Sequence, residues 1–299
     1  MLERAAVVGA GTMGAAIAAV FASNGYSVSV YSRSERTLEA ARKVVAALAG
    51  EHAPVDYTDT LEQCVNGASI VSENVAEDVA IKQQIFGEIE AVVSPDCLLT
   101  TNTSSVPISV IAEGLRYPER LVGLHWFNPA AIMPLVEIVR GARTADEVVN
   151  RTRAVCVRLG KASIEVNRDI AGFVVNRLQY AMLREALYLV EQGVASIEDV
   201  DRAVETTLAP RWSASGPLQL MDLAGLDVVE KVSSMLMPSL SRDMDTSLIV
   251  RQLCAERAFG IKSGRGFYQW TTESIATALR RRDETVQMLR DRAASGAQS

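Results

Sequence analysis

The stretch Ala5-Ala6-Val7-Val8-Gly9-Ala10-Gly11-Thr12-Met13-Gly14 carries the strongest information on the fold of this chain. Its first four residues form an apolar run that is typical of a short buried strand. The small residues at 15–22 continue as a helix that ends at Asn24-Gly25, and residues 27–31 predict a second strand. Because the G-x-G-x-x-G loop lies inside a complete strand–turn–helix–strand unit, it indicates a bound dinucleotide rather than a chance match.

Each glycine of this loop has a different structural role. Gly9 permits the tight turn, Gly11 lets the backbone approach a pyrophosphate, and Gly14 allows the helix to pack closely against the sheet. The phosphates would then lie at the first helical turn, beside Thr12 and Met13, where free N–H groups and the helix dipole favour negative charge. We therefore predict that these five residues bind a nicotinamide dinucleotide.

The residues after the second strand bear on which dinucleotide is bound. An NAD site usually places Asp or Glu there to accept a hydrogen bond from the ribose 2′-hydroxyl, whereas this chain has Ser32-Arg33-Ser34. An arginine between two hydroxyls can hold a 2′-phosphate through charge-assisted hydrogen bonds, although Arg33 could also be an ordinary surface residue. We predict NADP as the cofactor, with NAD as the alternative.

The chain continues to alternate between strand-like and helical patterns. We expect strands at 68–71, 98–100, 121–125 and 135–139, and helices at 78–91 and 146–159. This alternation predicts an α/β Rossmann-type fold with a mainly parallel, doubly wound sheet. After Gly172 the pattern becomes helical only. The predicted domains are a dinucleotide-binding domain over residues 1–170 and an all-α domain over residues 171–299.

The composition limits the class of partner. The chain of 299 residues carries 30 basic and 36 acidic side chains, which gives a net charge of −6 at pH 7. This balance argues against nucleic acid or an anionic membrane as the main partner. No apolar stretch approaches the ~20 residues of a membrane span. We expect a small-molecule substrate.

The cysteines and the N-terminus bear on the compartment. The four cysteines are scattered without a C-x-x-C pair, so we expect neither a disulfide framework nor a metal site. The first apolar strand begins within five residues of Met1, which leaves no room for a signal peptide. We therefore expect a cytoplasmic protein with reduced thiols.

The two histidines are the candidates for a near-neutral acid or base. His52 lies in a polar segment, whereas His125 ends an apolar strand. Glu137 interrupts the apolar run 135–139, where burial of a carboxylate is costly unless it is paired. A His125–Glu137 pair would remove that cost and would keep the imidazole oriented and more basic. The alternative is two separate structural residues.

Over nearly its whole length the chain resembles the 3-hydroxyacyl-CoA dehydrogenase family. The motifs that carry the resemblance follow the family's order, and they are Gly9 to Gly14, Asn102-Thr103-Ser104-Ser105, Gly123 to Pro129, Leu135-Val136-Glu137, Gly172-Phe173-Val174-Val175-Asn176-Arg177, Gly216-Pro217 with Asp222, Gly225-Leu226-Asp227, and Gly264-Arg265-Gly266-Phe267-Tyr268.

The resemblance implies a role for each of four catalytic residues. His125 would be the general base and Glu137 its orienting carboxylate, while Ser104 and Asn176 would hydrogen-bond the reacting substrate oxygen. In the oxidising direction His125 would take the hydroxyl proton as the C3 hydride passes to the nicotinamide, and in reduction the imidazolium would return that proton.

Further expectations follow from the same resemblance. We assign Asn102 to cofactor binding and Asn128 to substrate contact. The family likeness also implies that the helical domain forms a homodimer and closes over the substrate, with hinge motion near Gly172.

The chain departs from the fatty-acid enzymes of the family in specific segments. Those enzymes usually carry an acidic residue where this chain has Ser32-Arg33, and residues 34–61 are too few for the long helical arm that helps them hold CoA. Ala209-Pro210-Arg211-Trp212 resembles the lambda-crystallin (gulonate 3-dehydrogenase) and carnitine dehydrogenase branches, which act on free hydroxy acids. Arg211 could clamp a substrate carboxylate, or it could be a surface residue stacked on Trp212.

Three functions stay open on the sequence alone. The leading hypothesis is an NAD(P)-dependent 3-hydroxyacyl(-CoA) dehydrogenase or reductase, and the second is a dehydrogenase of a free 3-hydroxy acid held by Arg211. The third is a crystallin-like protein that binds the dinucleotide without catalysis. The crystallin-like hypothesis predicts that one or more catalytic residues are replaced, whereas all four residues implied by the resemblance are present.

Overall fold

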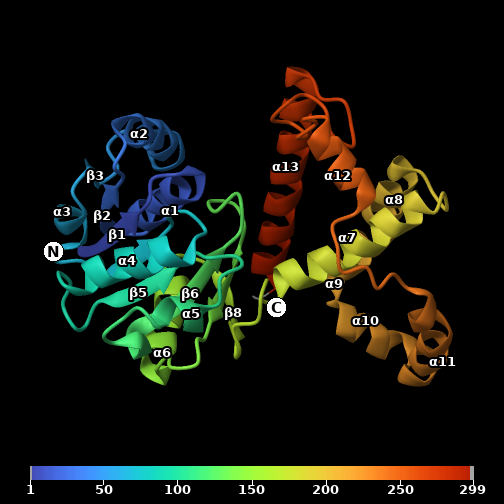
Figure 1. Ribbon diagram of the computed structural model, residues 1–299, viewed down its shortest axis with the longest axis horizontal. Coiled ribbons are helices and arrows are strands. Elements are labelled where there is room, and N and C mark those ends of the chain that lie inside the picture. The colour runs from blue at the N-terminus through green and yellow to red at the C-terminus, as the bar shows by residue number, and fades with distance from the viewer. Residues whose placement is uncertain (1, 297–299) are drawn as a thin grey trace. The chain divides into compact units, whose positions relative to one another are not determined.

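The computed structural model describes residues 2–296, and the first part of the chain is a twisted sheet flanked by helices (Figure 1). Within the described residues, eight strands pair in the order β3-β2-β1-β4-β5-β6-β7-β8. The strands are β1 (Glu3–Val8), β2 (Tyr26–Tyr31), β3 (Val55–Thr58), β4 (Ile70–Glu73), β5 (Leu98–Thr101), β6 (Leu121–Trp126), β7 (Leu135–Val139) and β8 (Ala162–Val166). Every pair is parallel except β6 with β7. The predicted mainly parallel, doubly wound sheet is confirmed.

Helices cover both faces of this sheet. One face packs against α1 (Thr12–Ser23), α2 (Glu35–Ala49) and α6 (Asp146–Arg158), and the other against α3 (Leu61–Val65), α4 (Val79–Glu90) and α5 (Ile108–Ala112). A short 3-10 turn, η1 (Pro118–Arg120), precedes β6. Almost all of α1 is buried, because its alanines and Gly14 let it approach the strands closely. Large buried side chains such as Phe21 and Phe86 each add roughly 1.5–3 kcal/mol through loss of exposed apolar surface.

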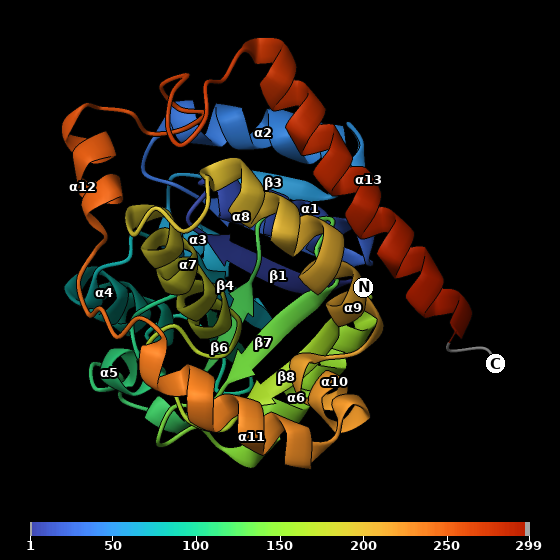
Figure 2. The same ribbon diagram turned by 90° about the vertical axis from the view of Figure 1, so that its right-hand side faces the viewer.

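The second part of the chain is helical, as predicted. It contains α7 (Val175–Glu191), α8 (Ile197–Ala203), a π-helical turn η2 (Val204–Leu208), α9 (Ala209–Ala214), α10 (Pro217–Ala224), α11 (Leu226–Leu236), a 3-10 turn η3 (Met237–Ser239), α12 (Leu248–Ala255) and α13 (Thr272–Gly296). Figure 2 shows α13 as one uninterrupted helix. None of the helices within residues 2–296 is both long enough and apolar enough to span a membrane.

The two compact units of the structure divide seven residues after residue 170, and the predicted domain boundary stays a prediction. Residues 1–177 and 178–299 form the two compact units, whereas the sequence placed the boundary after residue 170. The physical reason is that the start of α7 belongs to the first unit. Phe173 is buried in the core of the sheet, and the backbone N–H groups of Val174 and Val175 donate hydrogen bonds to Glu137 in β7.

Candidate functional site

The glycine loop follows β1 at the carboxyl ends of the parallel strands. The N–H of Gly9 donates to the carbonyl oxygen of Tyr31 at 3.0 Å, which joins the loop to the end of β2. Gly9 has a φ of +106°, and a Cβ atom there would lie 2.5 Å from the carbonyl oxygen of Asn74. A Cβ atom at Gly14 would lie 1.8 Å from the carbonyl oxygen of Gly9. Both positions therefore require glycine.

The first turn of α1 presents donors to the space beside this loop. The first hydrogen bond of the helix runs from Ala15 N–H to the carbonyl of Gly11 at 2.9 Å, and no side chain caps the helix. A Cβ atom at Gly11 would meet no atom within 4 Å. The N–H groups of Thr12 and Met13 precede the first helical hydrogen bond, so they can bind a phosphate. This turn fits the pyrophosphate of a dinucleotide.

Ser32 and Arg33 follow directly after β2, next to the glycine loop. The Ser32 hydroxyl oxygen accepts a hydrogen bond from Ser34 N–H at 3.3 Å, and Ser34 in turn caps α2 by accepting from Thr37 N–H at 3.4 Å. Arg33 is exposed, and no carboxylate among the described residues forms an ion pair with it. Its guanidinium group can therefore reach a ligand at the end of β2.

His125 and Glu137 face each other across the antiparallel pair β6 and β7. The two residues are direct partners in the strand register, and Nδ1 of His125 lies 2.6 Å from Oε2 of Glu137. The exposed fraction is 3% for the histidine and 0% for the glutamate. The second carboxylate oxygen of Glu137 accepts from the N–H groups of Val174 at 3.1 Å and Val175 at 2.9 Å. The structure thus brings together the predicted pair.

The surroundings keep this carboxylate ionised. Burial alone would raise the pKa of Glu137, but the hydrogen bond from His125 and those from the Val175 and Val174 N–H groups lower it below its ordinary value. An ionised Glu137 accepts the Nδ1 proton of His125, which leaves Nε2 of the neutral ring as a proton acceptor. Nε2 lies 3.1 Å from the hydroxyl oxygen of Ser104.

A turn before α7 supports the pair from its other side. Gly172 and Phe173 have φ values of +75° and +49°, so two successive residues adopt the left-handed conformation. This conformation is unfavourable for phenylalanine and is retained here by tertiary contacts. The ring of Phe173 packs 5.5 Å from that of His125, and the ring of Phe127 packs 4.7 Å from it. Two aromatic rings therefore pack against the imidazole.

The predicted asparagines occupy different surroundings. Asn102 joins three strand ends, because its N–H donates to the Glu73 carbonyl at 2.9 Å, its amide donates to Asn74 at 3.0 Å, and its amide oxygen accepts from Trp126 N–H at 2.9 Å. Asn128 is exposed beyond β6. Asn176 lies in the first turn of α7, directly after the N–H groups that bind Glu137, and is half-buried.

Arg211 lies in α9 of the helical unit. Its Nε donates to the carbonyl oxygen of Thr207 at 3.1 Å, and the side chain is exposed. Among the residues that the structure describes, Arg211 has no stacking contact with Trp212. Both interpretations of Arg211, as a surface residue and as a ligand of a substrate carboxylate, therefore stay predictions.

Three charged residues close to Ser104 were missed from the sequence. Glu77 accepts hydrogen bonds from the loop that carries Ser104, while Lys82 and Glu73 are buried behind Glu77. A signal was available, because Glu73 ends an apolar strand in the same way that Glu137 interrupts one. The argument that a buried carboxylate is costly unless it is paired, applied to β4 as well as to β7, would have identified Glu73.

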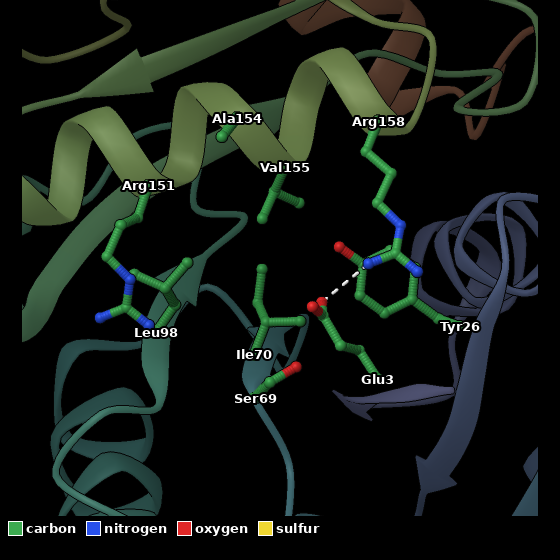
Figure 3. A pocket seen from close by; sticks show the side chains of 9 residues that line it. All are labelled: Glu3, Tyr26, Ser69, Ile70, Leu98, Arg151, Ala154, Val155 and Arg158. Atoms are coloured by element: carbon green, nitrogen blue, oxygen red, sulfur yellow. Dashed lines mark hydrogen bonds and ion pairs between the residues drawn. The ribbon is translucent and has the colours of Figure 1, made fainter. Parts of the chain in front are cut away.

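A separate cavity of about 310 Å³ lies at the opposite ends of the strands (Figure 3). It is bounded by α6 and by the first residues of β1, β4 and β5, with Arg151 and Arg158 on either side of an apolar floor that includes Ile70 and Leu98. Arg158 is already paired with Glu3 at 2.8 Å. This cavity contains none of the predicted site residues.

Comparison with known protein families identifies the chain. The model of the 3-hydroxyacyl-CoA dehydrogenase NAD binding domain matches residues 4–170, and the model of the C-terminal domain of the same enzymes matches residues 172–270. The chain belongs to the 3-hydroxyacyl-CoA dehydrogenase family. The resemblance seen in the sequence is thereby confirmed, and α13 lies beyond the matched part of the C-terminal domain.

Individual members of the 3-hydroxyacyl-CoA dehydrogenase family match most of the chain. It is 36% identical over 285 residues to 5-formyl-3-hydroxy-2-methylpyridine 4-carboxylate 5-dehydrogenase of Mesorhizobium japonicum, covering 91% of this chain and 92% of the relative. It is 37% identical over 287 residues to 3-hydroxybutyryl-CoA dehydrogenase of Mycobacterium tuberculosis, covering 90% of this chain and 99% of the relative.

A solved structure agrees with these relatives. The crystal structure of a 5-formyl-3-hydroxy-2-methylpyridine 4-carboxylic acid 5-dehydrogenase, described as an NAD+ dependent dismutase, has a TM-score of 0.91 and 35% identity. It covers 97% of this chain and 98% of its own. The protein is therefore an oxidoreductase of the 3-hydroxyacyl-CoA dehydrogenase family with an NAD-binding domain.

Proposed function

We propose that this enzyme transfers hydride between a nicotinamide cofactor and the hydroxyl-bearing carbon of a 3-hydroxyacyl substrate, with His125 as general base and acid. The observation that carries the proposal is the hydrogen-bonded series Ser104–His125–Glu137. It begins at an exposed hydroxyl and ends at a fully buried carboxylate. Such an arrangement can take a proton from a substrate at the surface of the first unit and stabilise the resulting imidazolium.

The residues of the glycine loop would hold the cofactor. Gly9, Gly11, Thr12, Met13 and Gly14 surround the pyrophosphate position. The bound nicotinamide supplies the hydride acceptor for oxidation and the hydride donor for reduction. Asn102, at the end of β5, is proposed to contact the cofactor at the same edge of the sheet.

Side chains of the protein accept the proton of the substrate hydroxyl and stabilise the charge that results. In oxidation, the O–H bond of the substrate breaks and its proton passes to Nε2 of His125, while the C–H bond breaks and its electron pair leaves with the hydride. Glu137 stabilises the imidazolium that forms. A substrate oxygen within reach of Nε2 is also within reach of the Ser104 hydroxyl, which is 3.1 Å from that nitrogen. Asn176 is proposed to donate the second hydrogen bond to this oxygen.

NADP is our proposed cofactor preference. Its support is the exposed guanidinium of Arg33, which lacks a carboxylate partner among the described residues and directly follows β2. A 2′-phosphate at the end of β2 would receive charge-assisted hydrogen bonds from Arg33 and a further one from Ser32. NAD is the alternative, which the NAD+ dependent relative favours.

A free carboxylic acid is the second candidate substrate. Its support is the match to an enzyme named for a pyridine carboxylate, which extends over 97% of this chain. In addition, residues 34–61 form one helix, α2, followed by β3 and the start of α3, so that segment contains no long pair of helices for CoA. Arg211 would bind the carboxylate in this case, and Asn128 is proposed to contact the substrate.

The helical unit is proposed to form a homodimer. Among the described side chains of residues 178–292, only Ser241 and Ala258 are buried. Leu218 is 83% exposed and Leu223 is 74% exposed, and α11 adds further exposed apolar residues. A domain of this size normally buries more than half of its surface, and homodimers are the commonest way to cover such a face. A second copy is the proposed occupant.

One experiment tests the catalytic proposal. Steady-state rates are measured with acetoacetyl-CoA, an acetoacetyl carrier-protein mimic and free 3-oxo acids, each with NADPH and with NADH. The wild-type enzyme is expected to turn over at least one pair, and His125→Gln to lose turnover while dinucleotide affinity stays within about twofold. Tight dinucleotide binding without turnover of any substrate would favour the non-catalytic, crystallin-like function instead.

A further inference from the structure

Ser104 lies on an exposed loop whose backbone is anchored by one carboxylate. Oε1 of Glu77 accepts hydrogen bonds from Ser104 N–H at 2.7 Å and Ser105 N–H at 2.8 Å. The same oxygen accepts from the Thr103 hydroxyl at 2.7 Å and the Ser105 hydroxyl at 3.0 Å. Three successive residues of the loop thus depend on the position of a single atom. If Glu77 moves, the hydroxyl of Ser104 moves with it.

Glu77 is held in turn by a buried ion pair. Nζ of Lys82 lies 3.3 Å from Oε2 of Glu77, and 2.9 Å and 3.0 Å from the two carboxylate oxygens of Glu73. Lys82 is 1% exposed and Glu73 is 0% exposed. Glu73 is fixed by donors from Thr101 and from the N–H of Val75, both at 2.6 Å. Strand β4 and helix α4 therefore hold both charges rigidly.

A buried ion pair of this kind contributes little to the net stability of a fold. Desolvation of two charges usually offsets most of their attraction, and apolar side chains of similar volume often give equal or greater stability. The desolvation of Lys82 and Glu73 is accounted for if this ion pair is needed to hold another group in position. The group that it reaches, through Glu77, is the loop bearing the hydroxyl that lies 3.1 Å from Nε2 of His125.

We propose that Lys82 and Glu73 are positioning residues, which hold Glu77 and through it fix the Ser104 hydroxyl at His125. This inference rests on the proposed function, in which Ser104 and His125 contact the reacting oxygen. Displacement of a contact by about 1 Å can cost on the order of 100-fold in rate, so a rigid anchor on secondary structure has a direct catalytic value.

The test variant is Lys82→Met combined with Glu73→Gln. The double change removes both buried charges together, whereas Lys82→Met alone would leave Glu73 buried and uncompensated. The introduced glutamine side chain keeps an amide oxygen that can accept from Thr101 and Val75. Glu73→Gln alone is a milder second variant that retains Lys82. Lys43→Met is the matched control, because Lys43 is an exposed lysine of α2 paired with Glu39.

Two readouts separate positioning from a general loss of stability. At saturating cofactor, we expect kcat of the double variant to be about tenfold to 100-fold lower than that of the wild type. Thermal unfolding should show a cooperative transition, which demonstrates that the variant is folded. Histidine side-chain NMR gives a readout without turnover, since the chain has two histidines and the exposed His52 serves as internal reference. The signals of His125 should shift, those of His52 should not, and Glu73→Gln should give a smaller change in the same direction.

Each outcome has a defined meaning. A double variant that folds with kcat within twofold of wild type and unshifted His125 signals would overturn the inference, as would an equal effect of Lys43→Met. If the double variant does not fold, the same criteria apply to Glu73→Gln. If the wild-type enzyme turns over no substrate, the proposed function fails, and the His125 signals still decide whether Lys82 and Glu73 position the loop.

Discussion

Nδ1 of His125 lies 2.6 Å from Oε2 of Glu137, while Nε2 of the same ring lies 3.1 Å from the Ser104 hydroxyl. One imidazole therefore connects a buried carboxylate in β7 to an exposed loop after β5. The other oxygen of Glu137 binds the backbone at the start of α7. The position of His125 thus depends on strand pairing, on the loop after β5 and on the turn before α7 at once.

Glu137→Gln should abolish most of the activity. The NH₂ group of the introduced amide would donate to Nδ1 of His125, which places the ring proton on Nε2 and removes the general base. We expect kcat to fall by roughly 10²–10⁴-fold, with dinucleotide affinity within about twofold of wild type by tryptophan fluorescence. Glu165→Gln, on the neighbouring strand β8, is the control. An active Glu137→Gln enzyme would show that the carboxylate is structural only.

Arg33→Ala should distinguish the two cofactors. Loss of one or more charge-assisted hydrogen bonds, at roughly 1.5–3 kcal/mol each, should weaken NADPH binding at least about tenfold and leave NADH binding nearly unchanged. Calorimetric titration with each cofactor measures both affinities. Arg36→Ala, an exposed arginine of α2, is the matched control. Equal losses for NADPH and NADH would rule out a 2′-phosphate contact and leave NAD as the cofactor.

Glu77 should contribute to stability in a pH-dependent manner. Burial alone would raise its pKa, but hydrogen bonds from Thr103 and the Ser105 backbone, with the charge of Lys82, lower it from 4.5 to about 2. A depressed pKa in the folded state stabilises the protein above pH 4.5, and this contribution is lost as the pH falls from there towards about 2.

Urea unfolding of wild type and Glu77→Gln between about pH 6 and pH 2.5 tests this dependence. The wild type should be more stable than the variant at about pH 6, and the difference in unfolding midpoint should shrink below about pH 4.5. Glu51→Gln, an exposed carboxylate in the turn after α2, should follow the wild-type curve. A difference that stays constant over this range would contradict the lowered pKa.

The helical unit should be dimeric in solution. Sedimentation at micromolar concentration should give twice the chain mass of 32.3 kDa. Leu223→Glu places a charge on the exposed apolar surface of α10 and should produce monomers with a lower thermal midpoint, by several degrees or more, because that surface stays exposed. Lys231→Glu, a polar change on α11, should leave the dimer intact. A wild-type monomer at this concentration would exclude the proposed interface.

The sequence predicted the centre of the sheet better than its edges. The predicted strands correspond to β1, β2, β4, β5, β6 and β7, each with a recognisable apolar run. Both edge strands of the sheet, β3 and β8, were missed. Edge strands bury less of their surface and mix polar residues such as Asp56, Ser163 and Glu165 with apolar ones, so their local pattern is weak.

The glycine loop, the alternation of strands with helices and the apolar runs interrupted by charged residues are local properties. They were therefore sufficient to predict the fold class, the family and the candidates His125 and Glu137. Which groups meet is a property of the folded chain. The His125–Glu137 contact depends on the β6–β7 register, and the contact of Lys82 with Glu73 depends on how α4 packs against β4. Such distances are set by strand pairing and helix packing between distant residues, and local spacing carries no direct information on them.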